Sequence, residues 1–282
     1  MSLGVLNNIA AIYAQNNLNQ TQSSLQNTLT QLSSGSRINS GADDAAGLAL
    51  ANGLQANVAA LTQSSQNASD GVGMLQTADG ALSQVTNLLN RAMTLATEAS
   101  NGTLNTAQSG SADAEYQSIL TEINNIGSAT NYNNNPLFSA TATSIVVSDG
   151  TTSGTTSFSE TVGVLTSASV GTTSGGAGED LSTTDLTNQT NALAALSKIS
   201  TAIGDVAYQR GTLGANINQL SAASNVASSE SVNLTSAENN IMATNYGQAT
   251  SDLSKFQVLS QTGISALAQA NSVQQEVLKL LQ

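Results

Sequence analysis

Apolar positions follow a helical period in both terminal parts of the chain. Over residues 54–99, and again after residue 186, apolar side chains recur at intervals that are mostly three, four or seven residues. The positions are Leu54, Val58, Leu61, Ala68, Val72, Leu75, Leu82, Val85 and Leu89, with Leu18, Leu25 and Leu32 upstream, and then Leu193, Leu196, Ile199, Ile203, Val206, Leu213, Ile217, Leu220, Leu253, Phe256, Ile264, Leu267, Val273, Val277 and Leu280. This spacing is typical of an amphipathic helix or coiled coil, so it predicts long helices in both regions.

The pattern changes twice between these two regions. Residues 112–127 predict a shorter third helix, because their large apolar side chains would share one face. Residues 139–184 are rich in Thr, Val and Gly and have no helical repeat, so they predict short strands and loops, with strands near 145–147 and 158–164. Residues 166–180 have the low complexity of a linker, and no Gly-Lys-Ser/Thr follows their glycines as in a phosphate-binding loop.

These elements favour one topology. Neither helical region can bury its apolar face alone, and each is about 100 residues long, which corresponds to ~150 Å of continuous helix. The simplest solution packs the N- and C-terminal helices side by side in an antiparallel pair. We therefore expect a mainly α fold, an elongated antiparallel coiled-coil or helical-bundle rod with a small β-hairpin-like tip.

Charge and composition narrow the classes of partner. The chain has 18 acidic and 6 basic residues, a net charge of -12, and only 9% charged residues in all. This balance argues against a sequence-independent grip on nucleic acid or on an anionic membrane. No run approaches ~18 apolar residues, so no transmembrane span is expected. The first residues lack the basic and apolar segments of a secretory signal, so we expect a cytosolic protein or one exported without cleavage.

The residue types present argue against an enzyme. The chain has no Cys and no His, which excludes Ser-His and Cys-His nucleophiles and the usual zinc sites. Asp43 and Asp44 are adjacent, so on a helix they would point about 100° apart, a poor geometry for shared acid-base chemistry. We therefore expect no catalytic residue, no metal site and no cofactor.

The segment at residues 33–55 concentrates charge in a chain that has little of it. Arg37 precedes Asp43 and Asp44 within a run of Gly, Ala and Ser. One interpretation is a helix that starts with a capping box at Ser40 and Asp43, beside an incidental arginine. The other is a junction at which Arg37 pairs with the aspartates, within one subunit or between two.

Three stretches of the chain resemble bacterial flagellins. Residues 32–54, LSSGSRINSGADDAAGLALANGL, are similar to the N-terminal flagellin signature, in which a Ser-Gly-x-Arg-Ile-Asn stretch leads into Asp-Asp-Ala-Ala-Gly. Residues 249–282 resemble the flagellin C-terminus, and residues 208–220, YQRGTLGANINQL, resemble the helix before it. The chain departs from the family at Ser36, at the missing basic residue before the acidic pair, and at 238–247, which carries a single acid.

The resemblance implies a division of the chain into five segments. Residues 1–42 and 242–282 would be the two halves of an inner terminal coiled-coil domain. Residues 43–138 and 185–241 would supply the N- and C-terminal helices of the rod domain, and residues 139–184 a β-rich variable tip with its linker. So short a central region implies a short flagellin.

The resemblance also implies a function and a set of partners. A flagellin is exported unfolded through the flagellar channel and polymerises with itself into the extracellular filament that drives swimming. The implied partners are the cap and hook-associated junction proteins, an export chaperone at the C-terminal region, the type III flagellar export apparatus and an animal Toll-like flagellin receptor. Two alternatives stay open, a hook-filament junction protein of the same family and an extracellular adhesin or immune-ligand module; abundance in sheared cell-surface material separates them from a filament subunit.

Seven residues are candidates for these contacts. Arg37, Asp43, Asp44 and Arg210 are candidates for subunit assembly. Residues 89–99, LNRAMTLATEA, are similar to the segment that the Toll-like receptor grips, which makes Arg91, Leu95 and Glu122 candidate receptor contacts. The alternative is that Leu95 belongs to the core and Arg91 is a solvated or inter-subunit charge.

Overall fold

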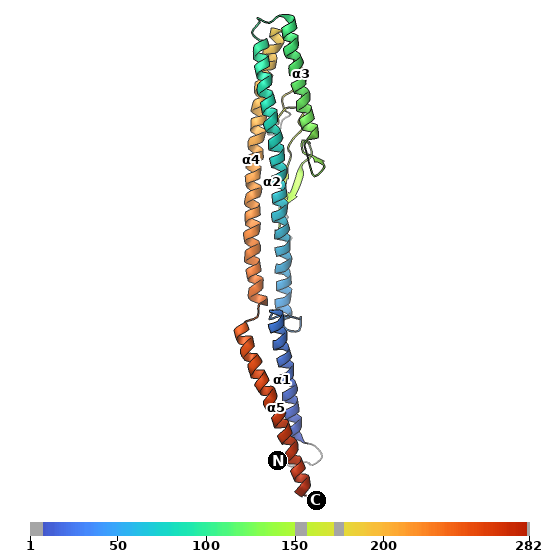
Figure 1. The fold of residues 1–282 in the computed structure, drawn as a ribbon, viewed down its shortest axis with the longest axis vertical. Coiled ribbons are helices and arrows are strands. Elements are labelled where there is room, and N and C mark those ends of the chain that lie inside the picture. Colours follow the sequence, from blue (N-terminus) through green and yellow to red (C-terminus); the bar gives the residue numbers. More distant parts are fainter. Residues whose placement is uncertain (1–7, 150–156, 172–177, 281–282) are drawn as a thin grey trace. The chain divides into compact units, whose positions relative to one another are not determined.

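The computed structural model describes residues 8–149, 157–171 and 178–280 of the 282-residue protein. Within these ranges the chain forms five helices and four short strands (Figure 1). The helices are α1 (Ile9–Ser34), α2 (Ala45–Ala99), α3 (Thr106–Ala129), α4 (Gln189–Met242) and α5 (Tyr246–Leu280), and the strands are β1 (Asn131–Tyr132), β2 (Asn135–Pro136), β3 (Thr143–Val146) and β4 (Ser157–Glu160). The predicted mainly α fold with long terminal helices is confirmed.

The chain divides into two compact units. The first unit consists of residues 1–56 and 233–282, and the second of residues 57–232. The first therefore combines the two ends of the protein, as the antiparallel pairing of the terminal helices requires. The two units are described separately below.

In the first unit, α1 and α5 pack against each other in antiparallel directions. Asn8 Nδ2, at the start of α1, donates to the carbonyl of Ala270 far along α5, while Thr244 Oγ1, just before α5, donates to the carbonyl of Gln31 near the end of α1. Asn8 also caps α1, since its side chain accepts from the amide of Ala11. Few side chains of this pair are buried, and Thr28 is the buried residue of α1.

In the second unit, α2, α3 and α4 bury a continuous apolar core. The α2 positions predicted from the heptad-like spacing form its centre, and Leu75, Leu82, Val85 and Leu89 are fully buried. The opposing face of α4 consists largely of small and branched side chains: Ala192, Ala195, Ile199, Ala202 and Val206. Alanine adds little side-chain volume, so helix backbones can approach closely at such positions. For the same reason the prediction for Leu193 is wrong: Ala192 and Ala195 occupy the buried face and Leu193 is 52% exposed.

The third helix is longer than the predicted 112–127. It begins at Thr106 because Asn105 and Gln108 form a capping box. The side chain of each residue accepts a hydrogen bond from the backbone amide of the other. The predicted apolar face is confirmed, with Tyr116, Ile119, Leu120 and Ile123 buried in the core and Ile126 packed at its edge.

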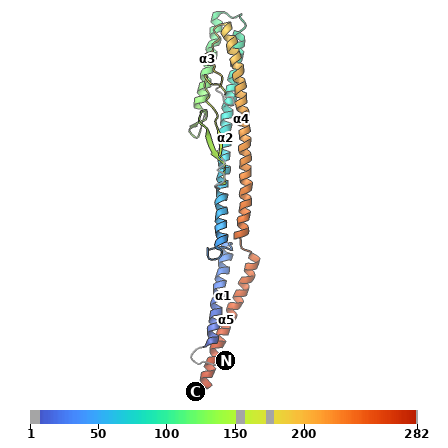
Figure 2. The same ribbon diagram turned by 180° about the vertical axis from the view of Figure 1, so that it is seen from behind.

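The strands form two small antiparallel pairs, of which the β3–β4 pair lies where strands were predicted and the β1–β2 pair was not predicted. β1 and β2 are joined at Asn133 and Asn134, both at positive φ, as a tight hairpin turn of this kind requires. β3 pairs with β4 so that Ile145 lies opposite Phe158. The β3–β4 pair lies along α2 (Figure 2). Two α2 side chains hold it there: Asn67 Nδ2 donates to the carbonyl of Val146, and Ser64 Oγ donates to the carbonyl of Ser148.

The range predicted to be a linker, 166–180, is packed against the helices at both its ends. Val170 is fully buried and exchanges two backbone hydrogen bonds with Glu179, and Lys198 Nζ on α4 donates to the carbonyl of Asp180 at 2.9 Å. The composition of the segment did not indicate this packing, because one buried valine, Val170, anchors residues that are otherwise mostly small or polar. Residues 172–177 of this range, like 150–156 of the tip, lie outside the described residues.

Candidate assembly surface and helix junction

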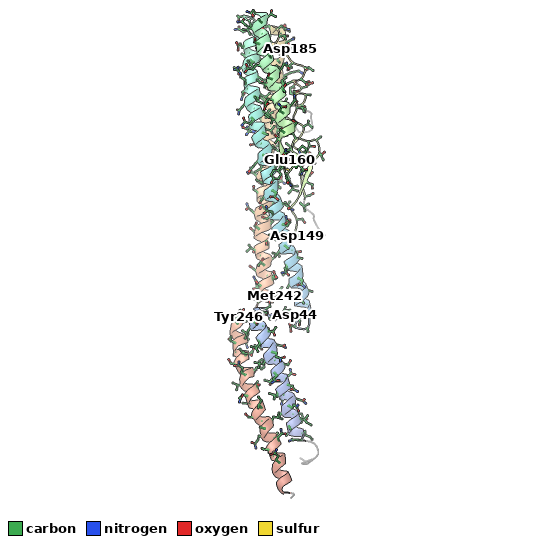
Figure 3. The ribbon with its side chains drawn as sticks, turned by 45° about the vertical axis from the view of Figure 1, so that its right-hand side comes forward. Asp44, Asp149, Glu160, Asp185, Met242 and Tyr246 are labelled. Atoms are coloured by element: carbon green, nitrogen blue, oxygen red, sulfur yellow. The ribbon has the colours of Figure 1, made fainter. Side chains whose placement is uncertain are left out.

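In the first unit, two helix breaks are hydrogen-bonded to each other. α1 ends where Gly35 takes a left-handed φ of 73°, and α4 ends at Met242, with three residues between it and the start of α5 at Tyr246. The Arg37 amide donates to the Met242 carbonyl at 2.6 Å, and the Thr244 amide donates to the Gly35 carbonyl at 3.0 Å. Figure 3 labels Met242 and Tyr246 on either side of the second break. We call residues 35–44 together with 241–245 the helix junction.

Arg37 completes the helix junction with its side chain. Its Nε and Nη2 atoms donate to the carbonyl of Ile241 at 3.2 and 2.8 Å. The last carbonyls of a helix have no partner within the helix and carry partial negative charge, so a guanidinium is well matched to them. Among the described residues, Arg37 forms an ion pair with neither Asp43 nor Asp44. Arg37 therefore does not pair with the aspartates within one subunit, and pairing with them between subunits stays a prediction.

The two aspartates have separate local roles. Asp43 Oδ2 accepts from the amides of Asn39 and Ser40 and from Ser40 Oγ at 2.8–3.1 Å, and these bonds lower the pKa of the Asp43 carboxyl, that from the Asn39 amide most. Asp44 Oδ1 accepts from the Gly47 amide at 2.8 Å and so caps α2. The prediction that a capping box at Ser40 starts the helix is wrong, because α2 begins at Ala45 and its first-turn amide at Gly47 donates to Asp44.

The first unit leaves many large apolar side chains exposed. On α1, Tyr13 is 67% exposed, and on α5, Val258 is 63% exposed. The other such side chains on these two helices are Ile9, Ile12, Leu29, Tyr246, Leu259, Ile264 and Val273. None of the residues of α1 is charged, so an identical helix would meet no like charge there. We call these exposed positions the terminal apolar surface. The predicted positions Val277 and Leu280 lie outside the side chains that the structure describes.

Arg210 lies in the second unit, where it links α4 to α2. Its Nε atom donates to Asp79 Oδ1 at 2.7 Å and its Nη2 atom to Asp79 Oδ2 at 3.3 Å. The hydrogen bond to Asp79 raises the pKa of Arg210. The two residues are 131 positions apart, so no local pattern in the sequence could have identified Asp79 as the partner.

The three candidate receptor residues have different environments. Arg91 Nε donates to Glu115 Oε1 at 2.7 Å and Nη2 to Oε2 at 3.0 Å, a two-point ion pair on an exposed surface. Glu122 is exposed and accepts from Asn125 Nδ2. Leu95 is only 4% exposed and belongs to the core of the second unit. The structure thus favours the alternative of a core role for Leu95.

The described residues contain no cluster that suggests another kind of site. Within those ranges, no group of three or more acidic, His or Cys side chains is arranged to hold a metal ion. None of the helices described combines the length and the apolar character that crossing a membrane demands.

The fold defines a mainly α protein whose paired terminal helices expose apolar side chains. Comparison with known proteins identifies the family. The model of the bacterial flagellin N-terminal helical region matches residues 5–143, and that of the bacterial flagellin C-terminal helical region matches residues 196–281. The chain belongs to the bacterial flagellin family.

Individual relatives agree with this assignment. The flagellin of Halalkalibacterium halodurans is 32% identical over 274 residues, which cover 97% of this chain and 98% of that one. The flagellin of Listeria monocytogenes is 30% identical over 285 residues, again 97% and 98% of the two chains. Among solved structures, the crystal structure of Bacillus cereus flagellin is similar with 27% identity and a TM-score of 0.49, covering 57% of this chain and 88% of that chain.

Proposed function

We infer that this chain is a structural subunit that self-assembles into the bacterial flagellar filament. The observation that carries this inference is the match to flagellins over 97% of the chain, with both terminal helical regions included. Relatives of nearly the same length bear the name flagellin, so a hook-filament junction protein or an adhesin is not favoured. The family has a structural role and makes an extracellular polymer.

We propose that the terminal apolar surface is where subunits contact one another. Fully burying a side chain such as Ile, Leu or Val contributes about 1.5–3 kcal/mol. α1 and α5 together expose nine large apolar side chains, seven of them Ile, Leu or Val and two of them Tyr. A second copy of the protein would cover them without bringing charges on α1 into contact. An open assembly of identical copies is the arrangement that repeats such a contact along a filament.

We propose further roles for the charged candidates. Arg37, Asp43 and Asp44 would hold the helix junction in the conformation that assembles. The exposed side chains of Arg37 and Asp43 would also contact a neighbouring subunit. Arg210, tied to Asp79 within the subunit, would support assembly by keeping α2 and α4 in register. Arg91 and Glu122 are the exposed members of the candidate receptor set, and Leu95 would act only by supporting the α2 backbone beneath Arg91.

The remaining partners follow from family membership alone. We propose the filament cap and hook-associated junction proteins, an export chaperone acting on the C-terminal region, the type III flagellar export apparatus and an animal Toll-like flagellin receptor. Secretion to the cell exterior and residence in the flagellum follow from the same proposal.

Electron microscopy of the purified protein under salt-induced polymerisation tests the function and the surface together. We expect helical filaments from the wild-type protein. Ile12→Asn and Val258→Asn should raise the protein concentration needed for assembly, because each places an amide where apolar contact is proposed. Val164→Asn is the matched control, since Val164 is an exposed valine of the second unit outside the terminal apolar surface.

The outcomes separate the two proposals. A folded wild-type protein that forms no filaments at any salt concentration contradicts the filament function. Filaments from Ile12→Asn and Val258→Asn at the wild-type concentration contradict the proposed surface and leave the function standing. Arg37→Ala belongs in the same assay, and normal assembly of that variant removes the helix junction from the proposal.

A further inference from the structure

The sequence contains two Asn-Gly pairs, and the structure places them in opposite environments. Asn52–Gly53 lies inside α2, and Asn101–Gly102 lies in the loop that joins α2 to α3 in the second unit (Figure 1). An asparagine followed by glycine is the pair in which the side chain reacts most readily with the backbone, because glycine has no side chain to hinder the approach. The two pairs therefore make a comparison within one protein.

The reaction needs only water and a free backbone amide. The amide nitrogen of the glycine attacks Cγ of the asparagine, a new C–N bond forms, and the bond between Cγ and Nδ2 breaks as ammonia leaves. The five-membered imide that results takes up one water molecule, which opens the ring at either carbonyl. The products are aspartate and isoaspartate, with a proton released to solvent from the new carboxyl. Loss of the amide proton to base starts the attack, so the reaction accelerates as the pH rises.

The loop around Asn101 leaves both reacting groups without a hydrogen bond. Asn101 and Gly102 are exposed, and within the described part of the protein neither the Asn101 side chain nor the Gly102 amide forms a hydrogen bond. Gly102 has a left-handed φ of 67°, outside any helix. Two contacts restrain this segment, the hydrogen bond from the Asn101 amide to the Glu98 carbonyl and the Gln189 side chain beside Gly102. Neither lies in a helix interior or a strand ladder, so the backbone can change its dihedral angles as ring closure demands.

Two other asparagines show what prevents the reaction. At Asn52 the following amide lies in the interior of α2, where helical hydrogen bonding holds it and fixes the dihedral angles. At Asn39 the following residue is Ser40, whose amide donates to Asp43 Oδ2 at 2.8 Å, while Asn39 Nδ2 donates to the Ser36 carbonyl. Each must break these bonds before its ring can close.

We propose that Asn101 is a site of spontaneous deamidation, and that in the folded protein it reacts faster than Asn52 and Asn39. The product carries a new negative charge just past the last turn of α2, near Glu98, on the shallow surface that Asn90, Thr94 and Thr97 also line. An isoaspartate also lengthens the backbone of the α2–α3 loop by one carbon atom. The protein thus acquires a charge at one position with time.

Peptide mapping by mass spectrometry after incubation tests the proposal. The full-length protein is held at neutral and at mildly alkaline pH, and the peptides that contain Asn39, Asn52 and Asn101 are followed for the exchange of an amide for an acid. We expect the Asn101 peptide to convert more than about tenfold faster than the Asn52 peptide, and faster at alkaline pH. Labelling by an isoaspartate-specific methyltransferase identifies the second product.

The protein unfolded in denaturant is the control for structure. There the Asn52 peptide should convert at a rate close to that of Asn101, because both are Asn-Gly pairs. Asn101→Gln should remove the methyltransferase signal from the folded protein. Equal conversion of Asn52 and Asn101 in the folded protein, or no conversion of Asn101 when the unfolded protein reacts, overturns the proposal.

Discussion

Single carboxylates in this protein behave in opposite ways because their surroundings differ. Asp43 accepts hydrogen bonds from two backbone amides and a hydroxyl, and Glu115 accepts two hydrogen bonds from the Arg91 guanidinium. Their charged forms are stabilised, and the pKa of each is lowered. Glu160, at the end of β4, is partly buried, and among the described residues no ion pair compensates it. Burial therefore raises its pKa.

Glu160→Gln should stabilise the second unit at neutral pH. The pKa of Glu160 is higher in the folded protein than its ordinary value of 4.5, so the folded state holds this proton more tightly than the unfolded state. Stability is then fully present below pH 4.5 and falls as the pH rises through the folded pKa. Removing the charge should raise the melting temperature at neutral pH, and the difference from wild type should vanish in acid.

Glu115→Gln is the matched control with the opposite sign. The hydrogen bond from Arg91 lowers the pKa of Glu115, so its contribution is present above the unfolded value and is lost as the pH falls through the folded pKa. This variant should lower the melting temperature at neutral pH, by a small amount because the pair is exposed. A melting temperature for Glu160→Gln that stays below wild type at neutral pH would contradict the assignment of burial as the cause.

At the scale of elements, helix starts are set locally and helix packing is set by distant backbone. α1 and α3 begin directly after their N-cap residues Asn8 and Asn105, whose side chains accept hydrogen bonds from amides of the first turn. The packing of α3 depends on the close approach of the 165–166 backbone. A side chain at Gly127 would collide with the carbonyl oxygen of Leu165, whereas one at Gly110 in the same helix would meet no neighbouring atom.

Gly127→Ala and Gly110→Ala should therefore have opposite effects on stability. We expect Gly127→Ala to lower the free energy of unfolding by about 1–3 kcal/mol, because the backbone must shift to admit a methyl group. Gly110→Ala should be neutral or raise it by up to ~1 kcal/mol, since alanine favours the helix. Urea denaturation followed by circular dichroism measures both. Equal effects of the two substitutions would mean that the Leu165 carbonyl does not confine α3.

At the scale of the whole molecule, the two units differ in how much apolar surface they bury. The second unit has a continuous core contributed by α2, α3, α4 and the strand region. The first unit buries few side chains and leaves the terminal apolar surface exposed. Helices without tertiary burial are marginal in water, because their own hydrogen bonds barely offset the cost of ordering the backbone.

Amide hydrogen exchange should therefore respond to assembly mainly in α1 and α5. In the monomer we expect rapid exchange along these helices and slow exchange in the core segments of α2 and α4, which serve as the internal reference. In filaments the amides of α1 and α5 should become protected. Protection of α1 and α5 in the monomer equal to that of the core would contradict the view that assembly, rather than folding, completes the first unit.

The amino-acid sequence by itself determined the features that depend on neighbouring residues. Helical spacing located the α2 and α3 faces, Thr and Val enrichment located β3 and β4, and the segment around Arg37 carried the flagellin signature. These predictions were correct because a helix face, a strand and a family motif each depend on residues within a short stretch of sequence.

Only the tertiary structure decided which distant groups meet. The Arg210–Asp79 ion pair spans 131 positions and the Arg37–Ile241 hydrogen bond spans 204. Ala192 rather than Leu193 faces the core of the second unit, and Asp44 rather than Ser40 caps α2 because its oxygen reaches the Gly47 amide. These contacts depend on the distances between segments that the fold brings together. Residue spacing along the sequence does not predict those distances.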